Sequence, residues 1–143
     1  MNSLDTNVLV YAVSALDGDK EKAARKLLGH ASNAGWPIPA QVYGEFFAVM
    51  TRRQYMTRKE ARAAIEAFSA VMPAIPSTVT AHVAALKLAA EKQVQYWDAL
   101  IIAVCAEHGV KQLYTEDAPS AARLLGVKCV SPFGVKQFRA TTP

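Results

Sequence analysis

Four acidic residues of this chain stand beside apolar blocks, where a charged side chain needs an explanation. They are Asp5, Glu45, Asp98 and Asp117. Burying an ionised carboxylate costs several kcal/mol unless the group is paired or coordinates a metal. Carboxylates that converge also raise one another's pKa, and a divalent cation removes both penalties. Because clustered hard oxygen ligands suit Mg²⁺ or Mn²⁺, these acids are candidates for a metal site.

The aspartates also have a purely structural explanation as helix caps. Asp is a favoured N-cap because its carboxylate accepts hydrogen bonds from the unpaired backbone N–H groups of the first turn. Asp5, Asp98 and Asp117 can each begin a helix in this way. Asp117 fits well, since a proline follows two residues later and proline is tolerated in the first turn. Capping and metal binding can coexist, so both explanations stay open.

Glu45 is harder to explain as a surface acid. It lies in the segment QVYGEFFAVM, where Val42 and Val49 are three residues before it and four residues after it. That spacing places Glu45 within the apolar stripe of a helix rather than opposite it. Salt bridges to arginine are the competing explanation, but no basic residue lies within one helical turn of Glu45.

Asp98 shows the same pattern at the start of the run DALIIAVC. Ile101, Ile102 and Cys105 follow it at the spacing of one helix face. The pattern predicts that Asp98 shares the buried face of its helix. It too has no basic neighbour within one turn.

Short apolar strands alternate with helices along the chain. Helices are expected over residues 8–13, 19–35, 41–54, 57–72, 79–95, 98–109 and 118–126. Strands are expected up to residue 5 and over residues 36–40, 73–78, 111–115 and 128–130. This alternation predicts one α/β domain over residues 1–143, with a parallel sheet covered on both faces. Ligands of such folds bind at the carboxyl ends of the strands, so the four acids are expected at one edge of the sheet.

Two details of these elements bear on the regularity of the fold. The segments WPIP and PAIP are rich in proline, which is awkward for central strands because proline donates no hydrogen bond. Within the helix at 79–95, an apolar stripe runs along one face: Val79, Val83, Leu86 and Ala90. Gly35 is the expected end of the helix at 19–35.

A basic segment follows the helix of Glu45 and gives the acids a possible substrate. Its residues are Arg52, Arg53, Arg58, Lys59 and Arg62, with Tyr55 and Met56 among them. Such a segment can follow a nucleic-acid backbone, although a solvated surface between two helices is an equally good explanation. Mg²⁺ held by a few carboxylates keeps an open position for phosphate, which points to phosphodiester hydrolysis.

Composition and missing motifs exclude several other classes. The net charge of +4 slightly favours a polyanionic partner. No apolar run is long enough to span a bilayer. A signal peptide needs a basic residue near its start, and no Lys or Arg precedes Lys20. The two lone cysteines, Cys105 and Cys129, indicate buried thiols in a reducing compartment. We therefore expect a cytoplasmic protein. The phosphate loops G-x-x-x-x-G-K-[ST] and G-x-G-x-x-G and the nucleophile elbow G-x-S-x-G are all missing.

Four stretches occur in order along the chain: SLDTNVLVYA, QVYGEF, WDALIIAVC and LYTEDA. Together they resemble the PIN domain, and most closely the VapC-like toxins of bacterial toxin–antitoxin pairs. The resemblance covers the chain from about residue 3 to residue 132. It implies a three-layer α/β/α sandwich with a short, mostly parallel central sheet.

The resemblance also implies an activity and a site. Members of the family are Mg²⁺- or Mn²⁺-dependent ribonucleases, and their metal-site acids fall on Asp5, Glu45, Asp98 and Asp117. The accompanying polar positions fall on Asn7 and Thr115, and Glu116 is an expected auxiliary acid. The implied reaction is water attack on an RNA phosphodiester, giving 5′-phosphate and 3′-hydroxyl ends. The implied partners are RNA, a second copy of the chain, and an antitoxin that occupies the active-site groove.

Three alternatives remain at the level of sequence. A phosphatase of the haloacid-dehalogenase type also has an Asp after its first strand, but it needs a second Asp where Asn7 stands. A catalytically silent module that binds nucleic acid or protein would keep the fold without the reaction. A solitary nuclease would lack the antitoxin, and the gene immediately upstream would distinguish it from a toxin.

Overall fold

The computed structural model describes residues 1–16, 18–117 and 119–133. The helices are α1 (Thr6–Val13), α2 (Asp19–Ala34), α3 (Ala40–Arg52), α4 (Arg58–Val71), α5 (Val79–Lys92), α6 (Tyr96–Glu107) and the 3₁₀ helix η1 (Ser120–Leu125). The strands are β1 (Asn2–Leu4), β2 (Ile38–Pro39), β3 (Ala74–Ile75), β4 (Gln112–Tyr114) and β5 (Lys128–Val130). In the described residues, no helix is long and apolar enough to cross a membrane.

All strand pairs in the structure are parallel, as the alternation of strands and helices predicts. β4 lies between β1 and β5, with Leu4 opposite Tyr114 and Tyr114 opposite Val130. β2 and β3 form a separate parallel pair. The Ser3 hydroxyl donates a hydrogen bond to the carbonyl of Pro37 at 2.6 Å, which ties β1 to the segment leading into β2.

The break between the two sheets follows from proline. β2 is only Ile38–Pro39, and Pro39 has no N–H to donate to a neighbouring strand. Pro39 therefore leaves one ladder hydrogen bond unmade, and β2 with β3 forms a pair separate from the sheet of β1, β4 and β5. The prediction that the proline-rich segments disturb the sheet is confirmed.

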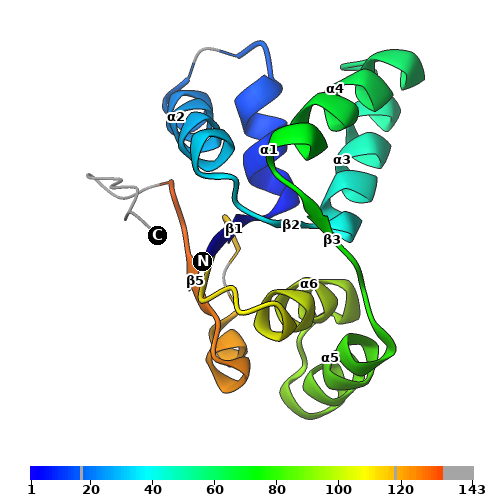
Figure 1. The fold of residues 1–143 in the computed structure, drawn as a ribbon, viewed down its shortest axis with the longest axis vertical. Helices are drawn as coiled ribbons and strands as arrows, with labels where there is room; N and C mark the ends of the chain where they lie inside the picture. The colour runs from blue at the N-terminus through cyan, green and yellow to red at the C-terminus, as the bar shows by residue number, and fades with distance from the viewer. Residues whose placement is uncertain (17, 118, 134–143) are drawn as a thin grey trace.

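Helices cover both sides of the strands. Figure 1 shows α1, α2, α3 and α4 on one side, with α5 and α6 on the other. This is the predicted three-layer α/β/α arrangement. The core between the layers includes the buried rings of Trp36 and Tyr114, stacked with centroids 5.7 Å apart, and the buried side chain of Phe46.

Local signals in the sequence account for most helix ends. Asp5 is the N-cap of α1, and Gly35 ends α2 in the left-handed conformation with φ 67°. Thr57 begins α4 with a capping box, since its hydroxyl accepts from the N–H of Glu60 and the Glu60 carboxylate accepts from the N–H of Thr57. These ends are close to those expected from the sequence.

One apolar stripe lies away from the core, and one expected helix takes another form. The apolar stripe of α5 does not face the core: Val79, Val83 and Leu86 are 80%, 61% and 59% exposed, and α5 instead packs on α6 through a second set of residues, Ala81, Ala85 and Leu88. Both faces of α5 are apolar, and small residues allow the closer approach of two helices. The helix expected over 118–126 is a 3₁₀ helix of six residues.

Cys105 is buried and Cys129 is half-buried, and both are free thiols. Burial raises the pKa of Cys105 to about 12 and that of Cys129 to about 11, with a smaller contribution from the charge of Asp5. Thiols with such pKa values are unreactive at neutral pH. Of the tail over residues 131–143, the part from 134 onward lies outside the described residues.

Candidate functional site

A cavity of about 490 Å³ opens where α1, α3 and α6 meet at the carboxyl end of β1. Its lining includes carboxylates from four segments of the chain: Asp5, Glu45, Asp98 and Glu116. It also includes Asn7 and two arginines of the basic segment, Arg52 and Arg53. We refer to it as the acid cavity.

Asp5 is both a helix cap and a cavity residue. One carboxylate oxygen, Oδ1, accepts from the N–H of Thr6 at 2.7 Å, and the other, Oδ2, accepts from the hydroxyl of Thr115 at 2.8 Å. Burial raises the pKa of Asp5, the two hydrogen bonds lower it, and the charges of Glu45 and Asp98 raise it again. The net effect is a raised pKa, which indicates a carboxylate held without a cationic partner.

Glu45 is half-buried on α3, beside the buried side chains of Val42 and Phe46. Its two carboxylate oxygens accept from different partners. The hydroxyl of Thr6 donates to Oε1 at 2.7 Å, and the side-chain amide of Gln41 donates to Oε2 at 2.9 Å. Glu45 is therefore fixed in orientation by neutral donors, which leave its negative charge uncompensated.

Asp98 lies in the first turn of α6, and its predicted burial is wrong. Ile101, Ile102 and Cys105 are buried as expected, but Asp98 is exposed. Helical spacing gives the direction of a side chain around the axis, not its depth, and the first turn of α6 extends beyond the core to the cavity. The pKa of Asp98 is raised first by desolvation, then by the charges of Glu45 and Asp117.

Asp117 does not line the acid cavity with the other three acids. It is exposed and lines a neighbouring cavity of about 490 Å³, to which Asp98 also contributes. Its charge raises the pKa of Asp98, so the two carboxylates are close enough to interact. Neither Asp98 nor Asp117 is a cap: the N-cap of α6 is Gln95 and that of η1 is Pro119.

The three accompanying polar residues form a chain of hydrogen bonds with Asp5. The Thr115 hydroxyl, which donates to Asp5, accepts from the amide of Asn7 at 3.3 Å. The side-chain oxygen of Asn7 accepts from the N–H of Glu116 at 3.2 Å. Thr115 is 1% exposed, so this chain joins α1 to the end of β4 from inside the fold.

Glu116 has its own partners away from the other acids. Its carboxylate accepts from the hydroxyl of Tyr11 at 3.2 and 3.3 Å and pairs with the ammonium of Lys20 at 2.5 Å. Glu116 thus lines the acid cavity with its charge already paired. Lys20 also lies over the rings of Tyr11 and Phe133, 5.4 and 5.8 Å from their centroids.

The basic segment divides between different surfaces. Arg52 and Arg53 line the acid cavity, whereas Lys59 and Arg62 line a separate groove between α3 and α4. Arg62 pairs with Glu66 at 3.7 Å on the same helix. Within the described part of the chain, Arg52, Arg53, Arg58 and Lys59 have no ion pair.

The donor set of the acid cavity fits a hydrated Mg²⁺ ion better than a closed metal cage. Within residues 1–16, 18–117 and 119–133, no group of three or more His, Cys, Asp or Glu side chains is arranged to hold a metal. Mg²⁺ keeps several of its waters and binds proteins through one or two carboxylates. Asp5 and Asp98, whose pKa values are raised, and Glu45, which has no cationic partner among the described residues, are the candidates for such ligands.

Sequence reasoning missed the residues that orient the acids. Thr6 and Gln41 hold Glu45, and Tyr11 and Lys20 hold Glu116. The contact of Gln41 with Glu45 could have been predicted, because Gln41 lies four residues before Glu45 on the same helix face. Lys20 had no such signal, since its contact with Glu116 joins parts of the chain that are far apart in sequence.

Comparisons with known proteins agree on the fold. The sequence profile of the PIN domain matches residues 3–121. No curated protein matches this chain at a significant level.

Several solved structures share the fold at low sequence identity. A toxin–antitoxin complex from Klebsiella pneumoniae is 20% identical with a TM-score of 0.68, over 94% of this chain and 100% of that one. FitAcB from Neisseria gonorrhoeae is 14% identical with a TM-score of 0.71, over 94% and 100%. The sarcin–ricin-loop-cleaving toxin VapC20 of Mycobacterium tuberculosis is 20% identical with a TM-score of 0.67, over 89% and 96%. At these identities the likeness establishes the fold.

Proposed function

This chain belongs to the PIN domain family, and on that premise we propose that it is a metal-dependent endoribonuclease, the toxin of a toxin–antitoxin pair. The observation that carries the proposal is the acid cavity. Asp5, Glu45 and Asp98 come from three elements, line one cavity and have no cationic partner among the described residues. Carboxylates that serve only stability are normally paired or solvated, so an uncompensated cluster of this kind is a candidate for metal binding.

The metal proposed is Mg²⁺ or Mn²⁺, held by Asp5, Glu45 and Asp98, with Asp117 beside Asp98. When bound, such an ion supplies Lewis-acid stabilisation of charge on a phosphate and makes water a better nucleophile. Thr115 and Thr6 orient Asp5, and Thr6 with Gln41 orients Glu45. Neutral donors suit this task because they fix the orientation of the carboxylates and leave their negative charge for the metal. A lysine or arginine would neutralise that charge instead.

Arg52 and Arg53 are proposed to bind the negatively charged phosphates of the substrate. They line the same cavity as the acids and have no ion pair among the described residues. Without cations, an acidic cavity would repel a polyphosphate chain, and unpaired guanidinium groups are good phosphate ligands. We propose that these arginines bind the RNA backbone while water attacks the phosphodiester, leaving 5′-phosphate and 3′-hydroxyl ends.

The toxin role is supported by the solved structures of similar fold, which include a toxin–antitoxin complex and FitAcB. The proposed antitoxin would occupy the groove of the acid cavity. A second copy of this chain is the other proposed partner, and the exposed stripe of α5 is the surface proposed for it, because Val79, Val83 and Leu86 leave a large apolar face in solvent.

An antiparallel crossing of two copies of α5 would bring the stripe against itself. In an interface with a twofold axis, the same patch must complement itself. If two copies of α5 cross antiparallel between residues 83 and 86, Val83 of one meets Leu86 of the other, and Val79 meets Ala90. The apolar residues thus pair with one another without a polar residue in the seam.

The activity is tested by Asp98→Asn, which keeps the size of the side chain and removes its charge. We expect cleavage of a single-stranded RNA in Mg²⁺ to fall about 100-fold or more, as when a main electrostatic group of an active site is lost. Asp19→Asn, at the exposed start of α2, is the matched control and should cleave like the wild type. Equal cleavage by Asp98→Asn and wild type, or full cleavage in EDTA, would refute the proposed mechanism.

A further inference from the structure

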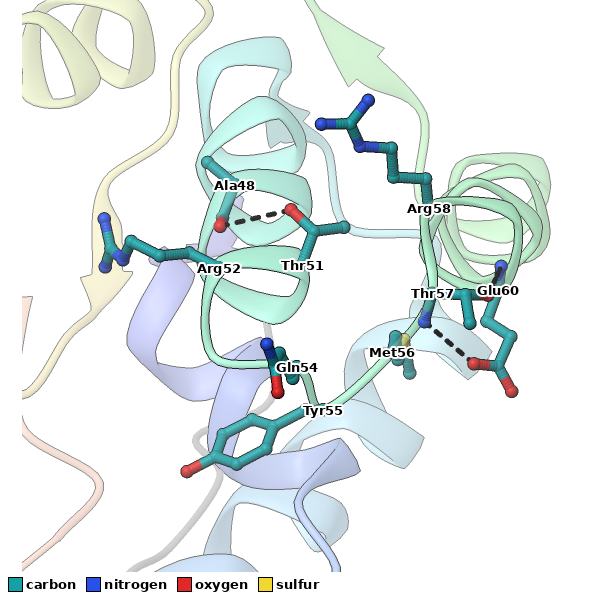
Figure 2. A pocket seen from close by; sticks show the side chains of 9 residues that line it. All are labelled: Ala48, Thr51, Arg52, Gln54, Tyr55, Met56, Thr57, Arg58 and Glu60. Carbon is teal, nitrogen blue, oxygen red and sulfur yellow. Dashed lines mark hydrogen bonds between the residues drawn. The ribbon is translucent and has the colours of Figure 1, made fainter.

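A further pocket, of about 710 Å³, lies at the turn between α3 and α4. Its lining comes from the end of α3, the turn and the start of α4: Ala48, Thr51, Arg52, Gln54, Tyr55, Met56, Thr57, Arg58 and Glu60. Figure 2 shows the side chains of Arg52 and Arg58 on either side of the end of α3, with the Tyr55 ring extending from the turn below them. We call it the turn pocket.

The turn pocket is continuous in its lining with the acid cavity. Ala48 and Arg52 contribute to both. A strand that lies in the acid cavity and continues past Arg52 therefore reaches the turn pocket next.

The turn is locked at both ends. α3 ends in a Schellman motif, in which the N–H of Tyr55 donates to the carbonyl of Met50 at 3.0 Å and the N–H of Gln54 donates to that of Thr51 at 3.1 Å. The capping box of Thr57 and Glu60 fixes the start of α4. The backbone that carries Tyr55 is thus held from both sides, which limits the entropy lost when its ring binds a ligand.

Tyr55 is presented to solvent rather than packed. Its side chain is 55% exposed, whereas its neighbour Met56 packs against the core. The ring has no aromatic contact with any ring of the described residues. Tyr55 thus places an exposed ring on a rigid turn, in a pocket that is also lined by Arg52 and Arg58, which have no ion pair in the described residues. Aromatic rings stack on bases, and guanidinium groups bind phosphates.

We propose that the turn pocket binds an unpaired base of the substrate strand, stacked on Tyr55, with Arg52 and Arg58 binding the flanking phosphates. This inference rests on the proposed nuclease function and adds a second contact point for the strand, outside the acid cavity. Stacking uses the face of a base, which every base has, so the pocket contributes affinity and register rather than strong sequence preference. The pocket combines a ring that can stack on a base with guanidinium groups that can bind phosphates, and this combination suits a nucleic-acid strand.

The test measures binding separately from cleavage. A fluorescein-labelled, unstructured RNA of about six nucleotides is titrated with the full chain in EDTA, where the proposed reaction cannot proceed, and anisotropy gives Kd. Tyr55→Ala should weaken binding about tenfold, and Tyr55→Phe, which keeps the ring, should stay within about twofold of wild type. Leu124→Ala, which removes an exposed apolar side chain on η1, is the control and should bind like wild type. Arg58→Gln should lower the slope of log Kd against log salt by about 0.7, the value for one phosphate on a single strand.

An oligonucleotide series assigns the effect to a base. One nucleotide at a time is replaced by an abasic residue along the RNA. At the position that Tyr55 contacts, the abasic RNA should bind the wild type about tenfold more weakly, and Tyr55→Ala should then cause no further loss. If Tyr55→Ala and the abasic replacements act additively at every position, stacking on Tyr55 is excluded.

The outcomes separate this inference from the proposed function. RNA binding that depends on the Tyr55 ring, in a protein that cleaves no RNA in Mg²⁺, would support the turn pocket and refute the nuclease. If the protein cleaves RNA in Mg²⁺ but Tyr55→Ala binds RNA as tightly as the wild type, the nuclease is supported and the turn pocket is refuted. If the wild type binds no oligonucleotide in EDTA, or binds it equally well without the Tyr55 ring, the inference is overturned.

Discussion

At the scale of single residues, two carboxylates of the acid cavity, Asp5 and Glu45, are held by neutral donors. Asp5 accepts from Thr6 and Thr115, and the oxygens of Glu45 are likewise occupied by a hydroxyl and an amide. Glu116 lines the same cavity but differs from them, because it pairs with Lys20. This difference separates two kinds of carboxylate. Asp5 and Glu45, which have no cationic partner among the described residues, are proposed to bind a metal, whereas Glu116 links α2 to the end of β4 through Lys20.

The uncompensated charges should lower the stability of the metal-free protein at neutral pH. The pKa of Asp98 is raised above 3.8 in the folded state, so the folded chain binds its proton more tightly than the unfolded chain. Stability is therefore lost as the pH rises from about 3.8 through the raised pKa. In EDTA at pH 7, Asp98→Asn should raise Tm by about 2 °C, a small change because the exposed carboxylate is screened by solvent. The difference should vanish well below pH 3.8, where the carboxyl group is protonated in both the folded and the unfolded chain.

Asp19→Asn is again the control. Asp19 lies in the first turn of α2, where a negative charge favours the helix dipole, so its removal should not raise Tm. Added Mg²⁺ should raise Tm of the wild type more than that of Asp98→Asn, because a ligand stabilises the state that binds it. A wild type that is more stable than Asp98→Asn in EDTA at pH 7 would contradict the view that Asp98 is uncompensated.

At the scale of elements, the helix ends decide how the site is presented. α1 begins on Asp5, so the residue that caps the helix is also the one that faces the cavity. α6 begins with a turn that extends beyond the core, which is why Asp98 is exposed. The turn between α3 and α4 is held by a Schellman motif and a capping box, and it carries the tyrosine proposed to stack on a base.

The Schellman motif of α3 uses a residue that is poorly suited to its conformation. Gln54 has φ 59°, a region that glycine adopts with little strain and other residues do not. Gln54→Gly should raise the free energy of unfolding by up to about 1 kcal/mol, measured by urea denaturation. The gain is limited because glycine also makes the unfolded chain more flexible.

Arg53→Gly is the matched comparison one residue earlier. Arg53 has φ −82°, where glycine offers no relief, so this change should lower stability. If both variants lost stability to the same extent, the strain assigned to Gln54 would be absent in solution.

At the scale of the whole molecule, the main unexplained surface is the apolar stripe of α5. A helix with two apolar faces normally has a partner on each. α6 covers the face of Ala81, Ala85 and Leu88, and nothing in the described residues covers the other. This asymmetry is the reason for proposing that a second copy of the chain packs there.

Val83→Glu tests the proposed dimer at the centre of the stripe. A buried carboxylate in the seam would be placed near its symmetry copy, so the dimer should dissociate to monomers in size-exclusion chromatography with light scattering. Thr80→Glu, also on the exposed surface of α5 but outside the stripe, should leave the oligomeric state unchanged. A wild type that is monomeric at high concentration would refute the proposed interface directly.

The sequence by itself determined the local features of this protein. Periodicity and capping residues predicted most helices and their ends, and the alternation of strands and helices predicted a parallel α/β fold, because these signals act between residues a few positions apart. The acids were recognisable for the same reason, since Glu45 and Asp98 interrupt apolar patterns that are visible within single segments.

Only the tertiary structure decided which groups meet. It placed Asp117 in a neighbouring cavity, brought Lys20 to Glu116, and left Asp98 exposed at the end of a buried helix. It also turned the face of Val79, Val83 and Leu86 to solvent, because the smaller residues of the other face allow α5 to approach α6 closely. The physical reason is common to all four: a repeat along the chain gives the direction of a side chain, whereas depth, partner and charge compensation depend on contacts between segments far apart in sequence.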